Sequence, residues 1–527
     1  MRRIAAVWIV VVMSLGLAAQ TPAPEAQPEG ADEAKAALSR EISAVGNLIE
    51  TEKYDEALSR AEAALVRFKE DYDLCLYKVQ ALKGLRRFKD AARAAVKSSR
   101  RFPGEGIFLY EGGDCAYRLG NFEGAIKIWS RLFENPEWAG VAAIRAARAH
   151  LLRGKEEAAE DVFDRAIEES GAPSAHLLVS SLQAEYDSGD ALSRLETLKK
   201  IDGKYAGDYE ELAKLYRRVS GGRLFRLSSE GDPPFEVPLK EKSERRDIPS
   251  LVWGGGDVGT ATLGSTAMVV VPVSLNGTKE RWMLLDSGAQ VILINPQVVE
   301  ELGLEKISTA HYIGLGAKGA QESGWVLFDS MKIGPVTVSS APALVIDEKA
   351  TFWEKVVGIV PTSLFRDFAM QYDRRGGKLT LHPSGTSPES VMKEGTFRVE
   401  SLWPGKRPYV ATTLAGHPDC YFLVDTGAHT TFISAERAES VGITVNSARY
   451  ATQRGEGLSG TFLSGVAENL TLDLGNARFE MPTVQVAEVG GGDQIECYGI
   501  LGRLTLDKFE IFFDYHANVV AFRDYDK

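Results

Sequence analysis

Two segments of this 527-residue chain repeat one another and decide the architecture of its C-terminal half. Residues 281–304 read RWMLLDSGAQVILINPQVVEELGL, and residues 420–443 read CYFLVDTGAHTTFISAERAESVGI. The two segments align without a gap, so that Asp286-Ser287-Gly288 falls on Asp425-Thr426-Gly427. Later matches, after a small change in the spacing, are Gly358 with Gly499, Phe368 with Phe509, and Asp373 with Asp514. The sequence therefore predicts a duplicated β lobe.

In both copies an aspartate follows an apolar stretch that has the character of a core strand. Asp286 and Asp425 therefore leave the core at a strand end, where burial and neighbouring groups can shift a carboxyl pKa. If the two loops face each other, the two carboxylates come together, and like charges so close cannot both ionise near neutral pH. One carboxylate can then act as a base on water while the other, protonated, polarises a peptide carbonyl.

The residues after each aspartate suit the support of such a pair. We expect the hydroxyls of Ser287 and Thr426 to hydrogen-bond backbone groups across the interface between the lobes and so to fix the loops. We expect Gly288 and Gly427 to permit the close approach of the opposite lobe. The motif therefore predicts a site that is complete only when both lobes are present.

These half-sites resemble those of the retropepsin-type aspartic proteases, which read Asp-Thr/Ser-Gly-Ala and have a later strand ending in two apolar residues and a glycine. The resemblance covers about residues 265–525, and it is full in the second copy, with Asp425-Thr426-Gly427-Ala428 and Ile500-Leu501-Gly502-Arg503. The first copy departs from the pattern, because Pro361 stands in place of the glycine. The resemblance implies an all-β bilobal acid-protease fold with lobes at 265–390 and 391–527, and a catalytic dyad of Asp286 and Asp425.

The resemblance also implies a β-hairpin flap between each half-site and the later strand. Two glycine-rich stretches lie in the right intervals, and they place the flap tips at Gly316, Gly319, Gly457 and Gly460. An ordinary mobile loop is the alternative for each. The first stretch also spells G-x-G-x-x-G, but residues 324–328 after it read as a strand and not a helix, which argues against a nucleotide site.

The N-terminal half shows a different repeat, with a fixed period. Ala57, Ala91, Ala125 and Ala159 recur at equal spacing, with aromatic residues upstream at Tyr54, Phe88 and Phe122 and small residues at Ala81, Cys115 and Ala149. The period resembles that of tetratricopeptide repeats, whose unit is about 34 residues long. The resemblance implies an all-α solenoid over residues 35–220, with a degenerate fifth unit at 174–218. In that family the concave groove usually binds a peptide or a partner protein. A spacer or brace for the C-terminal lobes is the alternative.

The N-terminal residues indicate the cellular location of the protein, and two further segments connect its domains. Residues 1–19 combine a basic start with an apolar run and small residues, which predicts a signal peptide and a periplasmic or extracellular protein. An uncleaved membrane anchor is the alternative, although the run is shorter than the ~20 residues that a spanning helix needs. Residues 20–34 read as a flexible tether and residues 221–264 as a linker. The net charge of -12 argues against nucleic acid as a partner.

Other chemistries find little support. The seven histidines form no metal-binding motif, so we expect no metal and no cofactor, and we expect His429 on the surface and not in catalysis. A bridge between Cys420 and Cys497 is one interpretation of the cysteines, and buried thiols are the other.

The sequence thus predicts an exported aspartic-type endopeptidase, a hydrolase, whose helical repeats recruit a peptide or protein substrate or a partner. The main alternative is a non-catalytic peptide-binding or scaffolding protein in which Pro361 marks the decay of lobe one. A third interpretation pairs each lobe with a lobe of another molecule. Ala289 and Ala428 offer no hydroxyl donor to the carboxylates, so we expect a pH optimum nearer neutral than that of gastric-type enzymes.

Overall fold

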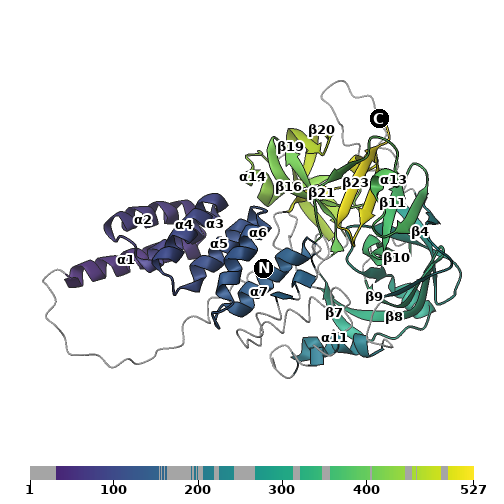
Figure 1. Cartoon of the computed structure of the whole chain (residues 1–527), viewed down its shortest axis with the longest axis horizontal. Helices are drawn as coiled ribbons and strands as arrows, with labels where there is room; N and C mark the ends of the chain where they lie inside the picture. The colour runs from purple at the N-terminus through teal and green to yellow at the C-terminus, as the bar shows by residue number, and fades with distance from the viewer. Residues whose placement is uncertain are drawn as a thin grey trace. The chain divides into compact units, whose positions relative to one another are not determined.

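The fold is taken from a computed structural model of the chain (Figure 1). It describes residues 31–153, 155, 157–159, 161–162, 192, 195–196, 199, 206–218, 225–242, 268–312, 321–346, 356–403, 406–445, 454–457, 460–487 and 497–526. The predicted signal peptide and most of the predicted tether therefore lie outside the described residues. The chain forms two compact units, which divide between Leu119 and Gly120.

The first unit is a stack of antiparallel helices in which each helix packs on the next. Its helices are α1 (Ala31–Glu50), α2 (Tyr54–Arg67), α3 (Tyr72–Gly84), α4 (Phe88–Arg101) and α5 (Gly106–Arg118). The period of the sequence repeat has a physical cause, because Ala57 and Ala91 are fully buried where neighbouring helices meet. Cys115 occupies the small-residue position of its repeat, and burial raises the pKa of its thiol to about 12, which fits a packing role.

The period continues into the second unit. Its helices in this region are α6 (Phe122–Trp129) and α7 (Ala139–Leu151), and Ala125 and Ala149 are fully buried there. The backbone N–H of Trp403 donates to the carbonyl of Leu152 (2.9 Å), which joins the segment after α7 to the β region. Most of the predicted fifth repeat lies outside the described residues, but its last part forms α11 (Ala206–Arg218).

Lobe one is a closed barrel. The ring runs β9-β6-β10-β5-β4-β8 and closes because β8 pairs with β9. Its strands are β4 (Met268–Leu275), β5 (Arg281–Asp286), β6 (Ile292–Ile294), β8 (Gln321–Ile333), β9 (Val336–Val345) and β10 (Gly358–Pro361). The short helix α12 (Pro296–Glu301) follows β6, and β1 (Arg226–Ser229), β3 (Lys240–Lys242) and β7 (Ser308–Tyr312) extend the sheet.

Lobe two repeats this topology strand for strand. Its ring runs β15-β16-β21-β17-β20-β19 and closes through the pairing of β15 with β19. The strands are β15 (Tyr409–Leu414), β16 (His417–Val424), β17 (Phe432–Ser434), β19 (Gly460–Leu474), β20 (Ala477–Ala487) and β21 (Cys497–Leu501). The ring is accompanied by β14 (Ser401–Leu402), β18 (Arg454–Gly457), α14 (Ala435–Ser440) and α15 (Arg503–Leu506). The prediction of a duplicated β lobe is confirmed.

A six-stranded antiparallel sheet joins the two lobes, in the order β13-β23-β22-β11-β12-β2. Lobe one supplies β11 (Phe368–Asp373) and β12 (Lys378–Pro383), and lobe two supplies β13 (Phe397–Val399), β22 (Phe509–Asp514) and β23 (Val519–Asp524). The sixth strand, β2 (Phe235–Pro238), comes from the segment predicted as a linker, because Phe235 and Val237 alternate inward and are buried.

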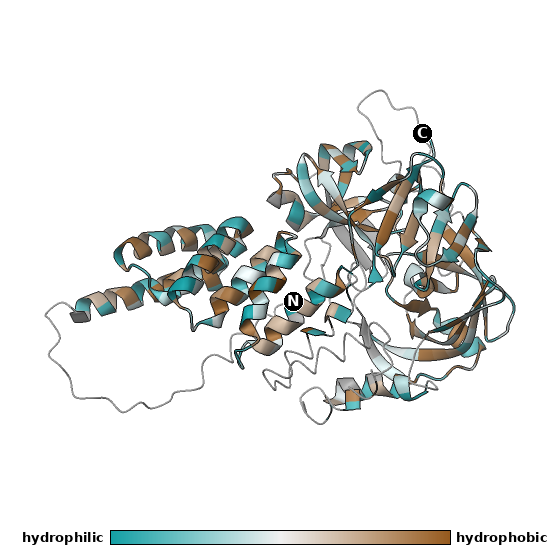
Figure 2. Cartoon of the chain, viewed as in Figure 1, coloured by the Kyte–Doolittle hydropathy of each residue, from teal (hydrophilic) through white to brown (hydrophobic). Residues whose placement is uncertain are grey.

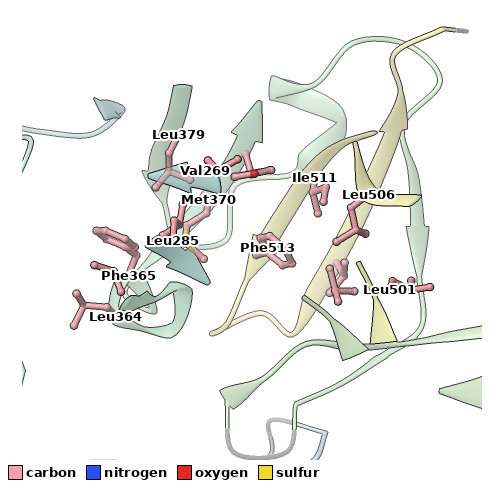
Figure 3. Close-up of a cluster of buried hydrophobic side chains, with 14 of the residues drawn as sticks. Val269, Leu285, Leu364, Phe365, Met370, Leu379, Leu501, Leu506, Ile511 and Phe513 are labelled. Carbon is pink, nitrogen blue, oxygen red and sulfur yellow. The ribbon is translucent and has the colours of Figure 1, made fainter. Parts of the chain in front are cut away.

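The core of this β region is continuous across the joining sheet. Figure 2 shows that hydrophobic residues are concentrated along its strands. Figure 3 shows Phe513 between lobe-one side chains such as Met370 and lobe-two side chains such as Leu501. Phe513 lies directly across from Met370 in the register of β22 and β11, so the same contact that fills the core also fixes the lobes to each other. Within the described part of the chain, no helix is long and apolar enough to cross a membrane.

The central position of Phe513 predicts its contribution to stability. Because the side chain is 1% exposed, Phe513→Ala is expected to destabilise the β region by about 3 to 5 kcal/mol through lost burial and the cavity left behind. Phe513→Leu keeps most of the apolar volume and should cost less than half as much. Urea unfolding followed by tryptophan fluorescence measures both, and equal stability of Phe513→Ala and the parent protein would contradict the assignment.

Candidate active site

Each half-site follows a strand that a parallel neighbour holds in place. Asp286 is the last residue of β5, and it lies across from Pro361 in the parallel register of β5 and β10. In lobe two, Val424 ends β16 across from Leu501 of β21, and the N–H of Asp425 donates to the carbonyl of Leu501 (3.1 Å). Parallel pairing inside a barrel therefore directs both aspartates out of the core at equivalent strand ends.

Four hydrogen bonds lock the two half-site loops together, and they are reciprocal. The N–H of Ser287 donates to Thr426 Oγ1 (3.0 Å), and the N–H of Thr426 donates to Ser287 Oγ (3.0 Å). Each hydroxyl in turn donates to a carbonyl of the opposite lobe, Ser287 to Val424 (2.7 Å) and Thr426 to Leu285 (3.0 Å). Both hydroxyl side chains are 1% exposed. The structure thus has the cross-lobe hydrogen bonds that the sequence predicts, and we call these four bonds the hydroxyl lock.

The carboxylates are held by their own loops. The N–H groups of Gly288 and Ala289 donate to Asp286 Oδ1 at 2.7 and 3.2 Å, and those of Gly427 and Ala428 donate to Asp425 Oδ1 at 2.9 Å each. In each carboxylate one oxygen is therefore engaged by backbone donors. The other oxygen, Oδ2, is the one available for chemistry.

The two glycines bring the carboxylates together. A Cβ atom on Gly288 would lie 2.6 Å from Asp425 Cγ, and one on Gly427 would lie 2.6 Å from Asp286 Cγ. Any side chain at either position would displace the opposite carboxyl group. The third residue of each Asp-Ser/Thr-Gly motif must therefore be glycine, because the aspartate of the opposite lobe occupies the space of a side chain.

The environment makes the two aspartates share a proton. Burial and the charge of Asp425 hold the pKa of Asp286 well above its ordinary value, and burial also raises the pKa of Asp425. A hydrogen bond between the two carboxyl groups raises the pKa of Asp286 and lowers that of Asp425. The two carboxyl groups therefore titrate as a pair, and near neutral pH the pair holds a single proton.

Pro361 is accommodated by a matching change in its neighbour. In lobe two the N–H of Gly502 donates to Thr431 Oγ1 (3.0 Å). At the equivalent positions of lobe one, proline has no N–H to donate and Ile292 offers no acceptor, so nothing is left unpaired by this exchange. The φ of Pro361 is -68°, close to the angle that its ring imposes. Pro361 therefore leaves β10 and the placement of Asp286 intact.

The predicted flap residues are placed only in part. Gly457 and Gly460 lie across from each other where β18 turns into β19, at the tip of a hairpin. In lobe one the corresponding hairpin is β7 with β8, and Gly316 and Gly319 lie outside the described residues. Their role as flaps stays a prediction.

The structure refines two expectations from the sequence. His429 is half-buried and its Nδ1 contacts Arg503 Nη2 (3.2 Å), so only part of its side chain is exposed at the surface. Of the two interpretations of the cysteines, the structure has the buried thiol at Cys420, because the register places Tyr421 and not Cys420 across from Cys497.

Sequence reasoning also missed side chains near the dyad. Thr362 Oγ1 and the Tyr515 hydroxyl form a hydrogen bond (2.6 Å), and burial raises the pKa of Tyr515 further from neutrality. Thr362 in lobe one and Arg503 in lobe two are equivalent in the alignment of the two copies, which was the signal that could have singled them out. Among the described residues, no group of three or more His, Cys, Asp or Glu side chains is arranged to hold a metal ion.

The fold and the site together define a bilobal acid-protease fold, in which a duplicated barrel supplies one aspartate from each copy. Residues 271–364 and 410–504 match the aspartyl protease family, one match in each lobe, and residues 76–136 match the tetratricopeptide repeat family. The C-terminal part of the chain is therefore a retropepsin-like aspartyl protease region with two tandem lobes, preceded by tetratricopeptide repeats. A comparison with curated proteins finds no match.

The hydroxyl lock predicts a specific loss on removal of one oxygen. Thr426→Val leaves the buried N–H of Ser287 without its acceptor and the carbonyl of Leu285 without its donor, which should cost about 1 to 3 kcal/mol. Thr426→Ser keeps the oxygen and is the matched control. Chemical denaturation measures both, and a loss in Thr426→Val no larger than that in Thr426→Ser would contradict the role assigned to the hydroxyl.

The dyad predicts how stability depends on pH. Because the native pKa of Asp286 lies above the unfolded value, the native state binds more protons, and stability falls as pH rises from about 4 through the raised pKa. Asp286→Asn removes this penalty, so its melting temperature should exceed that of the parent by about 2 °C or more at pH 7, and the difference should vanish near pH 4. Thermal unfolding across that range measures it. A constant difference at every pH would refute the shared proton.

Proposed function

We propose that this protein is an exported aspartic endopeptidase that hydrolyses peptide bonds with water activated between Asp286 and Asp425. The observation that carries the proposal is the hydroxyl lock, which holds the two carboxyl groups together with their Oδ1 atoms engaged by backbone N–H groups. A structural role for this arrangement is a poor alternative, because burying two carboxyl groups side by side costs stability.

The mechanism divides the roles between the two aspartates, with the single proton of the pair starting on Asp286. Asp425, charged, takes a proton from the attacking water as the water oxygen bonds to the peptide carbonyl carbon. Asp286, protonated, donates its proton to the carbonyl oxygen, which gives a neutral tetrahedral intermediate. Asp425 then returns a proton to the amide nitrogen while Asp286 takes one back from a hydroxyl of the intermediate, the C–N bond breaks, and the dyad is left with its single proton.

Three parts of the chain outside the dyad also support the proposal: the hairpins, the tetratricopeptide repeats and the N-terminal residues. In the sequence, the hairpins β7–β8 and β18–β19 lie between each half-site and the strand that pairs with it, β10 or β21. A flap in this interval would exclude water from a bound peptide. The tetratricopeptide repeats favour protein interaction, and we propose that their groove recruits a substrate or a partner. Export rests on the sequence of residues 1–19. The alternative of a non-catalytic scaffold is motivated by Pro361 alone, which Ile292 accommodates.

The direct test replaces each aspartate by asparagine. Asp286→Asn and Asp425→Asn each remove the carboxyl group that moves a proton, so hydrolysis of a fluorescently labelled, denatured protein should fall by about 10²-fold or more between pH 4 and pH 8. Asp419→Asn is the matched control in lobe two, because Asp419 is exposed and its φ of 60° suits asparagine equally well.

Peptide hydrolysis that survives in both dyad variants would contradict the assignment of Asp286 and Asp425 as the catalytic pair. Loss of activity in all three variants would point to damage to lobe two and not to the dyad. The pH optimum of the parent protein is expected nearer neutral than acid, since burial raises the pKa of both aspartates.

A further inference from the structure

The two half-site loops are not supported alike. In lobe two the start of α15 is tied to the half-site loop by two backbone bonds, from the N–H of Arg503 to the carbonyl of Ala428 (2.9 Å) and from the N–H of Leu504 to the carbonyl of His429 (3.1 Å). The Arg503 side chain adds a third bond, from Nη2 to His429 Nδ1 (3.2 Å). His429 follows Asp425 closely in the chain, so this contact connects α15 to the loop that carries the charged aspartate.

The side-chain bond fixes the state of the imidazole. A guanidinium can only donate, so Nδ1 must present its lone pair, and His429 is neutral with its proton on Nε2. Arg503 is 5% exposed, and its Nε and Nη1 atoms have no hydrogen-bond partner among the described residues. His429 Nδ1 is therefore a needed acceptor for a buried cation, and its loss would leave that cation poorly compensated.

A second cation also faces His429. Arg374, which follows β11, lies close enough to lower its pKa, although Arg374 is itself paired with Glu241 (2.9 Å) and with Asp507. The groups that face Arg503 are Arg374, Tyr372, Glu241 and Asp425. Burial, Arg503 and Arg374 together hold the pKa of His429 below its usual range, because a proton there would add a third positive charge to this cluster.

Lobe one has no titratable counterpart of this contact. Gln290 stands where His429 stands, and Thr362 stands where Arg503 stands. Thr362 bonds the Tyr515 hydroxyl (2.6 Å), and the pKa of Tyr515 is raised by burial, so this pair stays neutral in acid. A fall in pH can therefore disturb the support of the Asp425 loop while the support of the Asp286 loop is unchanged.

We propose that His429 is a positioning residue for Asp425, and that its protonation breaks the contact with Arg503, displaces the half-site loop and ends peptide hydrolysis on the acid side of the pH range. This inference rests on the proposed function. Two protonations then abolish peptide hydrolysis in acid, one on the carboxylate of Asp425 and one on His429. Each contributes about a tenfold loss per pH unit below its own pKa.

The test is the acid limb of the pH profile of kcat/KM. His429→Gln copies lobe one and supplies an amide oxygen that Arg503 can still donate to but that does not titrate. The parent protein should show a limiting slope of two on a plot of log kcat/KM against pH, and His429→Gln a slope of one, with activity retained to lower pH. His417→Gln, a change of an exposed histidine in the same lobe, should keep the slope of two. An acid limb that His429→Gln leaves unchanged would overturn the proposal.

A second measurement needs no activity. Because the native pKa of His429 lies below the unfolded value of about 6.5, the unfolded state binds the extra proton first, and stability falls as pH drops through that value. In the Asp286→Asn background the melting temperature should therefore drop more between pH 7 and pH 5 with His429 than with His429→Gln. Equal drops would overturn the proposal. If the parent protein had no peptidase activity but still showed the larger drop in melting temperature with His429, the proposed function would be refuted while the contact between His429 and Arg503 would be supported.

Discussion

The structure of the site depends on a reciprocal exchange of hydrogen bonds between two buried hydroxyl groups. Ser287 and Thr426 each accept from the other's backbone and donate to a carbonyl of the other's strand. Neither lobe can satisfy these groups alone, and an unsatisfied buried donor or acceptor costs about 1 to 3 kcal/mol. The lobes are therefore driven into one relative position, and in that position Gly288 and Gly427 let each carboxyl group lie against the opposite loop. The shared proton of Asp286 and Asp425 is a consequence of this constraint.

Around that shared centre the two lobes have diverged, and at one position the change is a matched pair. Where lobe two has Gly502 donating to Thr431, lobe one has Pro361 beside Ile292, and both the donor and the acceptor have been removed together. Such paired exchange keeps the number of unsatisfied buried groups constant while the residues change. It also explains how a duplicated site becomes asymmetric without loss of geometry. The asymmetry that results is chemical, because a buried arginine lies near Asp425 and a neutral tyrosine lies near Asp286.

The duplication itself was readable from the sequence, and so was most of the site. The alignment of residues 281–304 with 420–443 predicted both lobes and the hydroxyl lock, since these depend on short segments with fixed internal spacing. The contacts that could not be predicted join residues far apart in the chain. Strand β2 pairs with β12, although all of lobe one's barrel strands lie between the two in the sequence. His429 likewise contacts Arg503, which lies far from it in the chain. The Cys420 register likewise depends on a bulge between β16 and β21 that the spacing of cysteines does not reveal.

The hairpin of lobe one is supported by a helix outside its barrel. Strand β7 is an edge strand of lobe one, and the N–H of Thr309 on it donates to Glu211 Oε2 (2.8 Å) of α11. Figure 1 shows α11 alongside β7, and Tyr216 of this helix packs with Ile307 and Trp325. A helix that takes up an edge N–H removes a site at which another strand could add. In lobe two, the described part of strand β18 pairs with β19. The hairpin of lobe one is thus tied to the helical segment that precedes it, so the helical region and the β region are joined at an edge strand as well as through the chain.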